Sequence, residues 1–231
     1  MSGNHNKATA AGLLVALGII YGDIGTSPLY VFDEVIKGKV ISGELIIGSL
    51  SCIIWTLTLQ TTLKYVMLTL KADNRGEGGI FSLYALVRRQ KKWLVLPAML
   101  GGAALLADGM ITPPISVTSA IEGLHQVDSI PLLKNITGDT IVVIVLCILA
   151  ILFFLQQFGT ASIGRMFGPI MFVWFIMLAV LGATHLMDDV NIFRAFSPHY
   201  AIELLTLYPK GFWILGAIFL CTTGAEALYS D

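Results

Sequence analysis

Three acidic residues stand inside segments that are otherwise apolar, and their chemistry points to a cation. Asp23, Asp108 and Glu226 each lie within or beside long runs of hydrophobic residues. A carboxylate inside hydrocarbon costs about 2.5–3.5 kcal/mol on insertion scales, so each one needs a partner or a role. Carboxylate oxygens are hard ligands, which suit an alkali cation and not a soft transition metal.

Two hydroxyl residues share a helix face with one of these acids. Asp108, Thr112 and Ser116 are spaced four residues apart, which at about 100° per residue confines them to an arc of about 80°. Pro113 and Pro114 lie between them, so two helix carbonyls lose their hydrogen bonds and a kink is predicted. Together these groups would supply oxygen ligands to a cation. The alternative for the hydroxyls is bonding back to helix carbonyls, and the pattern favours neither.

Asp23 lies in a segment that interrupts an apolar helix, residues 22–28, with the sequence GDIGTSP. In hydrocarbon every backbone group must be satisfied internally, so an interrupted helix is tolerated mainly where the freed groups line a cavity or bind a ligand. The alternative is that Asp23 caps the second half-helix, in competition with Ser27. Glu226 follows Thr223 and Gly224 and has the same ambiguity. Two interrupted helices and one polar face favour a site near the membrane midplane.

The elements that would position these residues are membrane-spanning helices. The chain of 231 residues is 56% hydrophobic and 13% charged, and its mean hydropathy is +0.81, which exceeds what a soluble core requires. We therefore expect an all-α integral membrane protein, with residues 1–231 forming a single polytopic domain. Six apolar segments approach or exceed the roughly 20 residues that a span needs: 8–36, 45–70, 94–119, 140–158, 166–187 and 212–229.

The basic residues predict how these spans are oriented. With a cytoplasmic N-terminus, nine basic residues fall inside and five outside, which favours that orientation. The cluster at 88–92, RRQKK, sets most of this bias, and contact with anionic membrane lipid is its alternative role. The inner residues are Lys7, Lys64, Lys71, Arg75, Arg88, Arg89, Lys91, Lys92 and Arg165, and the outer ones are Lys37, Lys39, Lys134, Arg194 and Lys210.

Several function classes are disfavoured by the same sequence. The net charge is −1 and the basic residues form no long stripe, so no nucleic-acid partner is expected. No nucleophile, base and orienting group occur together, so we expect neither an enzyme nor a cofactor. Residues 72–79, with the sequence ADNRGEGG, resemble a phosphate-binding loop only weakly, because no strand precedes them and no Gly-Lys-Ser/Thr closes them. Residues 80–87 predict a short amphipathic helix.

Four sequence blocks resemble the KUP/HAK/KT family of potassium uptake proteins. They are GDIGTSPLY at 22–30, ADNRGEGG at 72–79, ITPPIS at 111–116 followed by AIEGL at 120–124, and TGAEALY at 223–229. They occur in the family's order along the whole chain. The resemblance implies K⁺ uptake coupled to H⁺ entry at the cell membrane, by a multi-pass protein whose transported ions are K⁺ and H⁺. The resemblance leaves open whether the full-length protein forms a homodimer.

The resemblance also implies a fold and a ligand set. The fold would be LeuT-like, of the APC superfamily, with this chain supplying the first inverted repeat and with helices 1 and 6 broken. The cation site would comprise Asp23, Tyr30, Asp108, Thr112, Ser116, Thr223 and Glu226. Crowding of three acids at one site leads us to expect that K⁺ binding and proton occupancy are linked.

The chain departs from that family in length. Family members have further spans and a cytoplasmic C-terminal region, which would follow Asp231. Two other interpretations therefore stay open beside the K⁺:H⁺ symporter. One is a truncated membrane fragment without transport activity. The other is an amino-acid transporter of the APC type, which we would expect to have fewer acids facing its site.

Overall fold

The computed structural model describes residues 9–72, 77–125, 137–157, 160–208 and 211–229, and the regular elements among them are helices without a β-strand. Five helical segments are long and apolar enough to cross a membrane. They are Gly12–Ile36, Gly43–Lys71, Lys92–Leu124, Gly138–Gln156 and Met166–Leu186. These segments confirm the predicted all-helical class, and their positions agree with the first five predicted spans.

The structure does not confirm the predicted break of the first span over residues 22–28, because the backbone stays close to helical throughout. Helix α1 (Ala10–Thr26) and helix α2 (Pro28–Ile36) are separated by Ser27 alone, and Ser27 keeps helical dihedral angles (φ −54°, ψ −36°). Proline is tolerated in the first turn of a helix because no N–H is needed there. The Ser27 N–H still bonds the Asp23 carbonyl at 3.1 Å. Asp23 therefore lies within α1, and the N-cap position of α2 belongs to Ser27.

The sixth predicted span, 212–229, is not a continuous helix of membrane length. Helix α10 (Gly211–Phe219) and a 3₁₀ turn, η5 (Leu220–Thr222), form a shorter apolar helix. The chain then leaves helical geometry at Thr223 (ψ 137°) and at Gly224, whose φ is 87°. A second 3₁₀ helix, η6 (Ala225–Tyr229), follows. The described residues therefore contain five helical segments of membrane length, and a shorter apolar helix stands where the sixth span was expected.

The second and third spans contain features that hydropathy does not reveal. The second begins as helix α3 (Gly43–Leu57), continues as an 11-residue π-helix, η1 (Thr58–Leu68), and ends in a 3₁₀ turn, η2 (Thr69–Lys71). Helix α4 (Gly79–Gln90) confirms the helix predicted at 80–87 and packs on α5. After a short 3₁₀ turn, η3 (Lys92–Leu94), helix α5 (Val95–His125) continues through both of its prolines.

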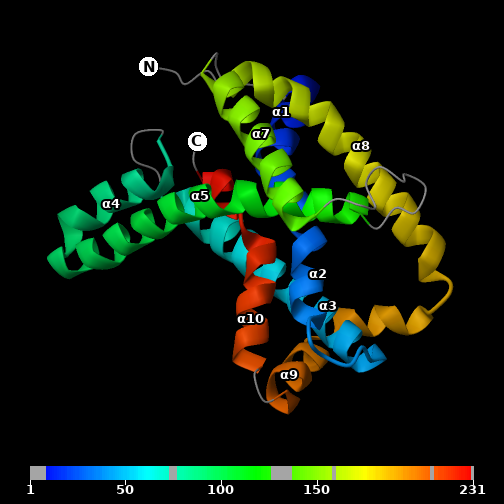
Figure 1. Ribbon diagram of the computed structural model, residues 1–231. Helices are drawn as coiled ribbons and strands as arrows, with labels where there is room; N and C mark the ends of the chain where they lie inside the picture. The colour runs from blue at the N-terminus through cyan, green and yellow to red at the C-terminus, as the bar shows by residue number, and fades with distance from the viewer. Residues whose placement is uncertain (1–8, 73–76, 126–136, 158–159, 209–210, 230–231) are drawn as a thin grey trace.

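Helix α1 and helix α8 cross at very close range (Figure 1). The fourth span is α7 (Gly138–Gln156) and the fifth is α8 (Thr160–Leu186). A Cβ atom added to Gly18 of α1 would lie 2.5 Å from the Gly168 nitrogen, and one added to Gly168 would lie 2.4 Å from the Leu14 carbonyl oxygen. Only glycines allow two backbones to approach in this way, as is common where membrane helices pack.

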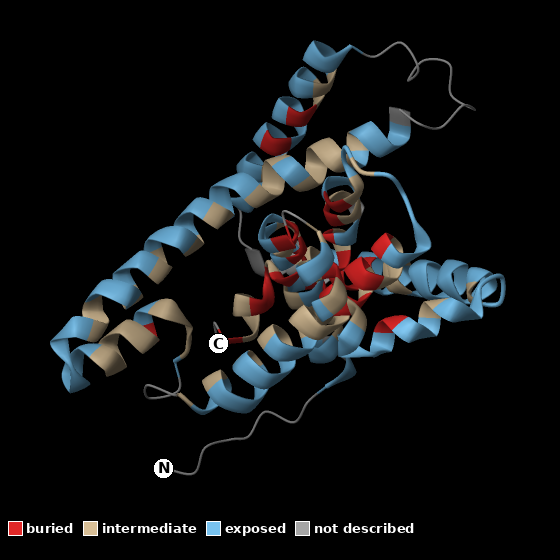
Figure 2. Ribbon diagram, turned by 90° about the horizontal axis from the view of Figure 1, so that it is seen from below, coloured by how far each residue is buried: buried red, intermediate tan, exposed pale blue. Residues whose placement is uncertain are grey.

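A buried cluster joins the remaining helices on the other side of the molecule. Figure 2 shows the buried residues, in red, gathered near its centre. The cluster combines residues of α2, α3, α10 and α9 (Pro198–Leu207), including Val31, Leu45, Leu204 and Ile218. A further 3₁₀ helix, η4 (Val190–Phe196), precedes α9, and the Trp55 indole donates to the Phe196 carbonyl at 3.1 Å.

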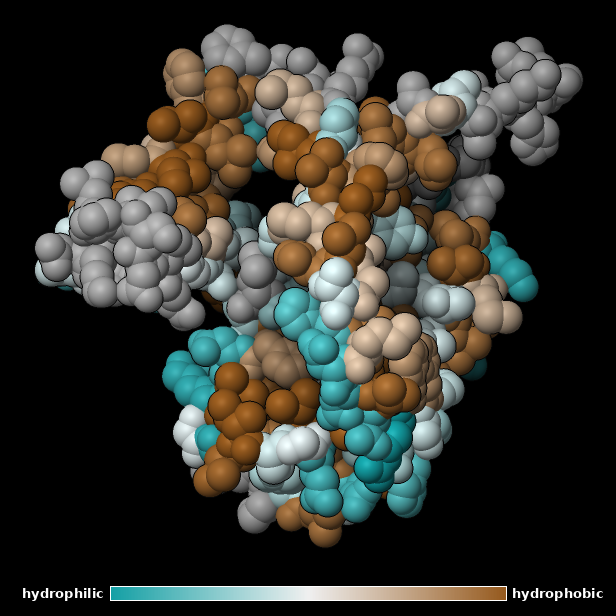
Figure 3. All heavy atoms as spheres, turned by 90° about the vertical axis from the view of Figure 1, so that its right-hand side faces the viewer, coloured by the Kyte–Doolittle hydropathy of each residue, from teal (hydrophilic) through white to brown (hydrophobic). Residues whose placement is uncertain are grey.

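Much of the remaining apolar surface is exposed. In Figure 3, brown hydrophobic residues cover much of the upper half of the face shown. In the most apolar 18-residue stretch of the third span, no residue is buried. In the corresponding stretches of the fourth and fifth spans, only 11% of the residues are buried. Such continuous apolar surface is typical of helices that face lipid or further spans.

Candidate cation site

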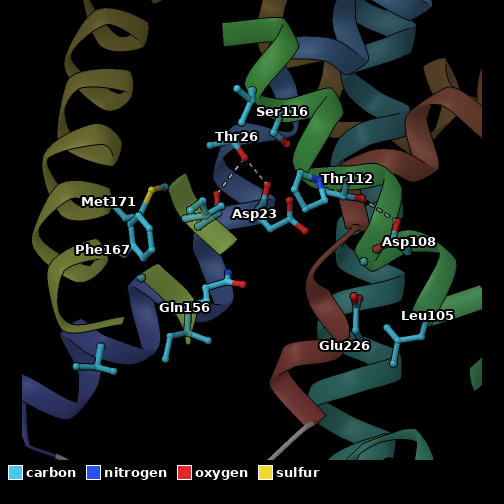
Figure 4. Close-up of a pocket in the computed structure, with 18 of the residues that line it drawn as sticks. Asp23, Thr26, Leu105, Asp108, Thr112, Ser116, Gln156, Phe167, Met171 and Glu226 are labelled. Atoms are coloured by element: carbon cyan, nitrogen blue, oxygen red, sulfur yellow. Dashed lines mark hydrogen bonds between the residues drawn. The ribbon is translucent and has the colours of Figure 1, made fainter. Parts of the chain in front are cut away.

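A cavity of about 1240 Å³ lies between α1, α5, α7 and α8, and η6 reaches it from one side (Figure 4). It brings together five of the seven predicted site residues from three separate parts of the chain. They are Asp23 of α1, Asp108, Thr112 and Ser116 of α5, and Glu226 of η6. In Figure 4, Asp23 faces Asp108 and Thr112 across the cavity, and Glu226 approaches from below.

The α5 stripe faces the cavity as its four-residue spacing predicts. Asp108, Thr112 and Ser116 all line it, together with Gly109 and Pro113. The Thr112 hydroxyl donates to Asp108 Oδ1 at 2.9 Å, so it bonds the carboxylate and not a helix carbonyl. This bond orients the carboxylate and leaves its other oxygen available to a ligand. Since Pro113 has no N–H, the Gly109 carbonyl has lost its usual helical partner at the edge of the same cavity.

Hydrogen bonds to the carbonyl oxygen of Asp23 fix its backbone near the end of α1. Its carbonyl oxygen accepts hydrogen bonds from the Ser27 hydroxyl at 2.9 Å and from the Thr26 hydroxyl at 3.1 Å. These bonds satisfy the carbonyl near the junction of α1 and α2 without using the Asp23 side chain. The carboxylate can therefore face the cavity while the backbone around it stays paired.

Gly224 brings the sixth segment directly against Asp23. A Cβ atom added to Gly224 would lie 2.7 Å from Asp23 Cβ and 2.9 Å from Asp23 Oδ2. With φ at 87°, Gly224 also adopts a conformation that other residues reach only with strain. Both constraints require glycine, and the resulting contact places η6, and with it Glu226, beside the junction of α1 and α2.

The cavity is electrostatically negative. It is lined by the three acids, and no basic side chain is found among its described lining residues. Ionised carboxylates carry the same charge, so those of Asp23, Asp108 and Glu226 would repel one another. Within the described ranges no three acidic, histidine or cysteine side chains are close enough to enclose one metal ion. The three acids line the cavity from α1, α5 and η6, and negative groups around one space attract cations.

The other two predicted residues lie outside this cavity. Tyr30 lines neither this cavity nor a second one described below, and its hydroxyl donates to Ser27 Oγ at 3.0 Å, which in turn donates to the Asp23 carbonyl. Thr223 lines a second cavity of about 790 Å³. Leu105, Asp108 and Glu226 line both cavities and so stand between them.

Several lining residues were not assigned to the site from the sequence. Gln156 of α7 lines the first cavity. The sequence feature that could have indicated this residue is a polar side chain at the end of an apolar segment. Lys64 and Gln60, both on the π-helix η1, line the second cavity together with Glu226. The Lys64 ammonium lies 4.8 Å from the centre of the Tyr65 ring. No local sequence pattern predicts a π-helix, although such segments often occur at functional sites.

Comparison with known proteins shows the family. The model of the K⁺ potassium transporter integral membrane domain matches residues 10–231. A probable potassium transport system protein Kup of Cytophaga hutchinsonii is 61% identical over 232 residues, which cover 98% of this chain and 34% of that protein. A protein of the same description from Clostridium perfringens is 57% identical, covering 97% of this chain and 35% of its own.

A third relative, the probable potassium transport system protein Kup 1 of Lactococcus lactis subsp. lactis, is 55% identical over 99% of this chain. The chain thus spans about a third of the length of the curated relatives it matches. No solved structure matches it significantly. The relatives are described as transport proteins, and the resemblance seen in the four sequence blocks is confirmed: this chain belongs to the family of the K⁺ potassium transporter integral membrane domain.

Proposed function

We propose that this protein takes up K⁺ across the cell membrane through the cavity between α1, α5 and η6, and that K⁺ entry is coupled to H⁺ entry. The observation that carries the proposal is the cavity itself, in which Asp23, Asp108 and Glu226 converge and no basic side chain is found among the described lining residues. The names of the relatives, all potassium transport proteins, support K⁺ as the ion.

Oxygen atoms in this cavity can replace part of the hydration shell of K⁺. Asp108 and Thr112 act as one hydrogen-bonded pair, and the Gly109 carbonyl lacks its helical partner. Carbonyl, hydroxyl and carboxylate oxygens are the groups that substitute for water around K⁺ in ion-conducting proteins. The negative potential raises the local concentration of any cation. The oxygen ligands then favour a monovalent ion that loses its water readily.

Coupling to protons follows from charge balance. One K⁺ neutralises one of three carboxylates, and uncompensated charge is costly away from water. The other two acids must therefore be protonated or find a cationic partner, which links proton occupancy to K⁺ occupancy. We assign the transported proton to Asp108 or Glu226, because these two residues border both cavities and can exchange with either.

The same proposal includes a LeuT-like arrangement with interrupted first and sixth helices. It is supported by the close contact between Gly224 and Asp23, which brings the non-helical backbone at Gly224 beside the end of α1. Transporters of this type bind ions where two discontinuous helices meet near the membrane midplane. An amino-acid transporter is the weaker candidate, since three acids and no basic group among the described lining residues would repel a substrate carboxylate.

Transport measurements in proteoliposomes test the proposal. We expect the intact protein to carry K⁺ inward, and an inward pH gradient at clamped voltage to raise the initial rate severalfold, since proton entry then drives K⁺ entry. A matched set of vesicles without a gradient is the control. K⁺ flux that ignores the gradient would reject coupling but keep K⁺ transport, and no K⁺ flux at all would reject the function.

We further propose that the N-terminus and the segment joining the second and third spans are cytoplasmic, on the basis of the basic residues. Arg89 of α4 and Asp189, before η4, are both exposed and fall on opposite sides of the membrane in this orientation. In an otherwise cysteine-free protein, Asp189→Cys should react with a membrane-impermeant maleimide in intact cells and Arg89→Cys only after permeabilisation. The opposite labelling pattern would invert the topology.

A further inference from the structure

The five-residue helix η6 carries Glu226 to the first cavity, and contacts with glycine backbones hold both of its ends. At its start, Gly224 packs against the Asp23 side chain. At its end, Tyr229 packs against residues of the segment that joins the second and third spans. A 3₁₀ helix this short has few hydrogen bonds of its own. The position of Glu226 therefore depends on what holds the two ends.

The contact at Tyr229 is close and specific. Tyr229 is 6% exposed, and its hydroxyl donates to the Ala72 carbonyl at 2.5 Å. A Cβ atom added to Gly78 would lie 2.0 Å from the Tyr229 carbonyl oxygen, so no residue with a side chain fits there unless the backbone moves. The buried Ser82 hydroxyl donates to the Glu77 carbonyl at 2.7 Å and fixes the chain beside Gly78.

These contacts explain part of the 72–79 block, whose sequence only weakly resembles a phosphate-binding loop. Gly79 has a φ of 82° and begins α4. Gly78 has no side chain, so the Tyr229 carbonyl can lie close to its backbone. Gly78 thus permits a close approach of two backbones, and Gly79 permits the positive φ at the start of α4. Tyr229 and Glu226 also line the same second cavity.

We propose that the contact of Tyr229 with Ala72 and Gly78 positions Glu226 for cation binding, so that Tyr229 and Gly78 are positioning residues of the site. In a 3₁₀ helix, residues three apart lie directly above one another, so Tyr229 stands one turn from Glu226 on the same side. Anchoring Tyr229 therefore fixes the position of the Glu226 carboxylate along the η6 axis and its rotation about that axis. A displacement of the segment beside α4 moves Glu226 with it. This inference rests on the proposed function.

Tyr229→Phe is the sharpest test, because it removes only the hydroxyl and keeps the buried ring. In the intact protein we expect the K⁺ concentration for half-maximal uptake to rise about two- to tenfold, the range that one lost hydrogen bond produces, with the maximal rate changed less than about twofold. Gly78→Ala should raise it by more, about tenfold or above. Combining the two should add little to Gly78→Ala alone, because both break the same contact.

Matched controls come from neighbouring positions. Tyr84→Phe on α4 removes a hydroxyl that bonds no described residue, and Gly123→Ala on α5 meets nothing within 4 Å. Both should leave the half-maximal K⁺ concentration unchanged. An unchanged value in Tyr229→Phe and Gly78→Ala, whether or not protein levels fall, would overturn the positioning role. Wild-type uptake in Glu226→Gln would instead reject the proposed site itself, so the two failures are distinguishable.

Discussion

Neutralising any one of the three cavity acids is expected to lower K⁺ uptake at least tenfold. Asp23→Asn, Asp108→Asn and Glu226→Gln each remove a charge that attracts the cation while keeping the shape of the side chain. An interaction with a charged group is worth about 1.5–3 kcal/mol, which corresponds to roughly 10- to 100-fold in affinity. Insertion into the membrane should be unaffected or improved, because the costly charge is gone.

The measurement is initial K⁺ or Rb⁺ uptake in a strain that lacks other K⁺ uptake systems, normalised to the amount of protein in the membrane. Asp33→Asn is the matched control, since Asp33 lies on α2 in the same span, is exposed and lines neither cavity. It should transport as the unaltered protein does. Normal transport in all three neutral variants would leave the cavity without a role in K⁺ uptake.

The second large effect is expected on stability, at the crossing of α1 and α8. Gly168→Ala places a methyl group 2.4 Å from the Leu14 carbonyl oxygen, and Gly18→Ala places one 2.5 Å from the Gly168 nitrogen. Backbone atoms cannot rotate away as a flexible side chain can, so the helices must separate. We expect a loss of at least about 2–3 kcal/mol in the free energy of unfolding, as for severe overpacking.

Gly182→Ala, on the same helix α8, is the control with the opposite expected sign. Nothing lies within 4 Å of a Cβ atom at Gly182, and alanine is favoured over glycine in a helix by up to about 1 kcal/mol. Thermal unfolding in detergent should therefore show a lower midpoint for Gly168→Ala and an equal or higher one for Gly182→Ala. A midpoint of Gly168→Ala at or above that of the unaltered protein would show that the crossing can open at no cost.

The sequence predicts best those features that depend on one helix. The stripe of Asp108, Thr112 and Ser116 could be derived because a fixed helical repeat orients side chains without knowledge of neighbours. The first five spans follow from hydropathy in the same way. All three residues line one cavity in the structure.

Features that depend on irregular backbone or on distant contacts could not be derived. The predicted break of the first span is not confirmed, because Ser27 and Thr26 bond the Asp23 carbonyl and the helix stays nearly continuous. Thr223 follows η5, where the backbone leaves helical geometry, and it lines the second cavity and not the first. The π-helix and the lining residues Gln156 and Lys64 are set by tertiary packing, which composition does not encode.

The short helix Gly211–Thr222 has a consequence for how the membrane voltage acts on the protein. Its nine residues in α10 and three in η5, set along the membrane normal, cover about 18 Å of a hydrocarbon core of about 30 Å. Gly224 and Glu226 would then lie deep within the electric field and not at its edge. Moving one charge across the full field is worth about 2.3 kcal/mol per 100 mV. An ion bound beside Glu226 would cross the field in two steps, one before binding and one after release. The membrane voltage would therefore affect both the binding and the release of the ion.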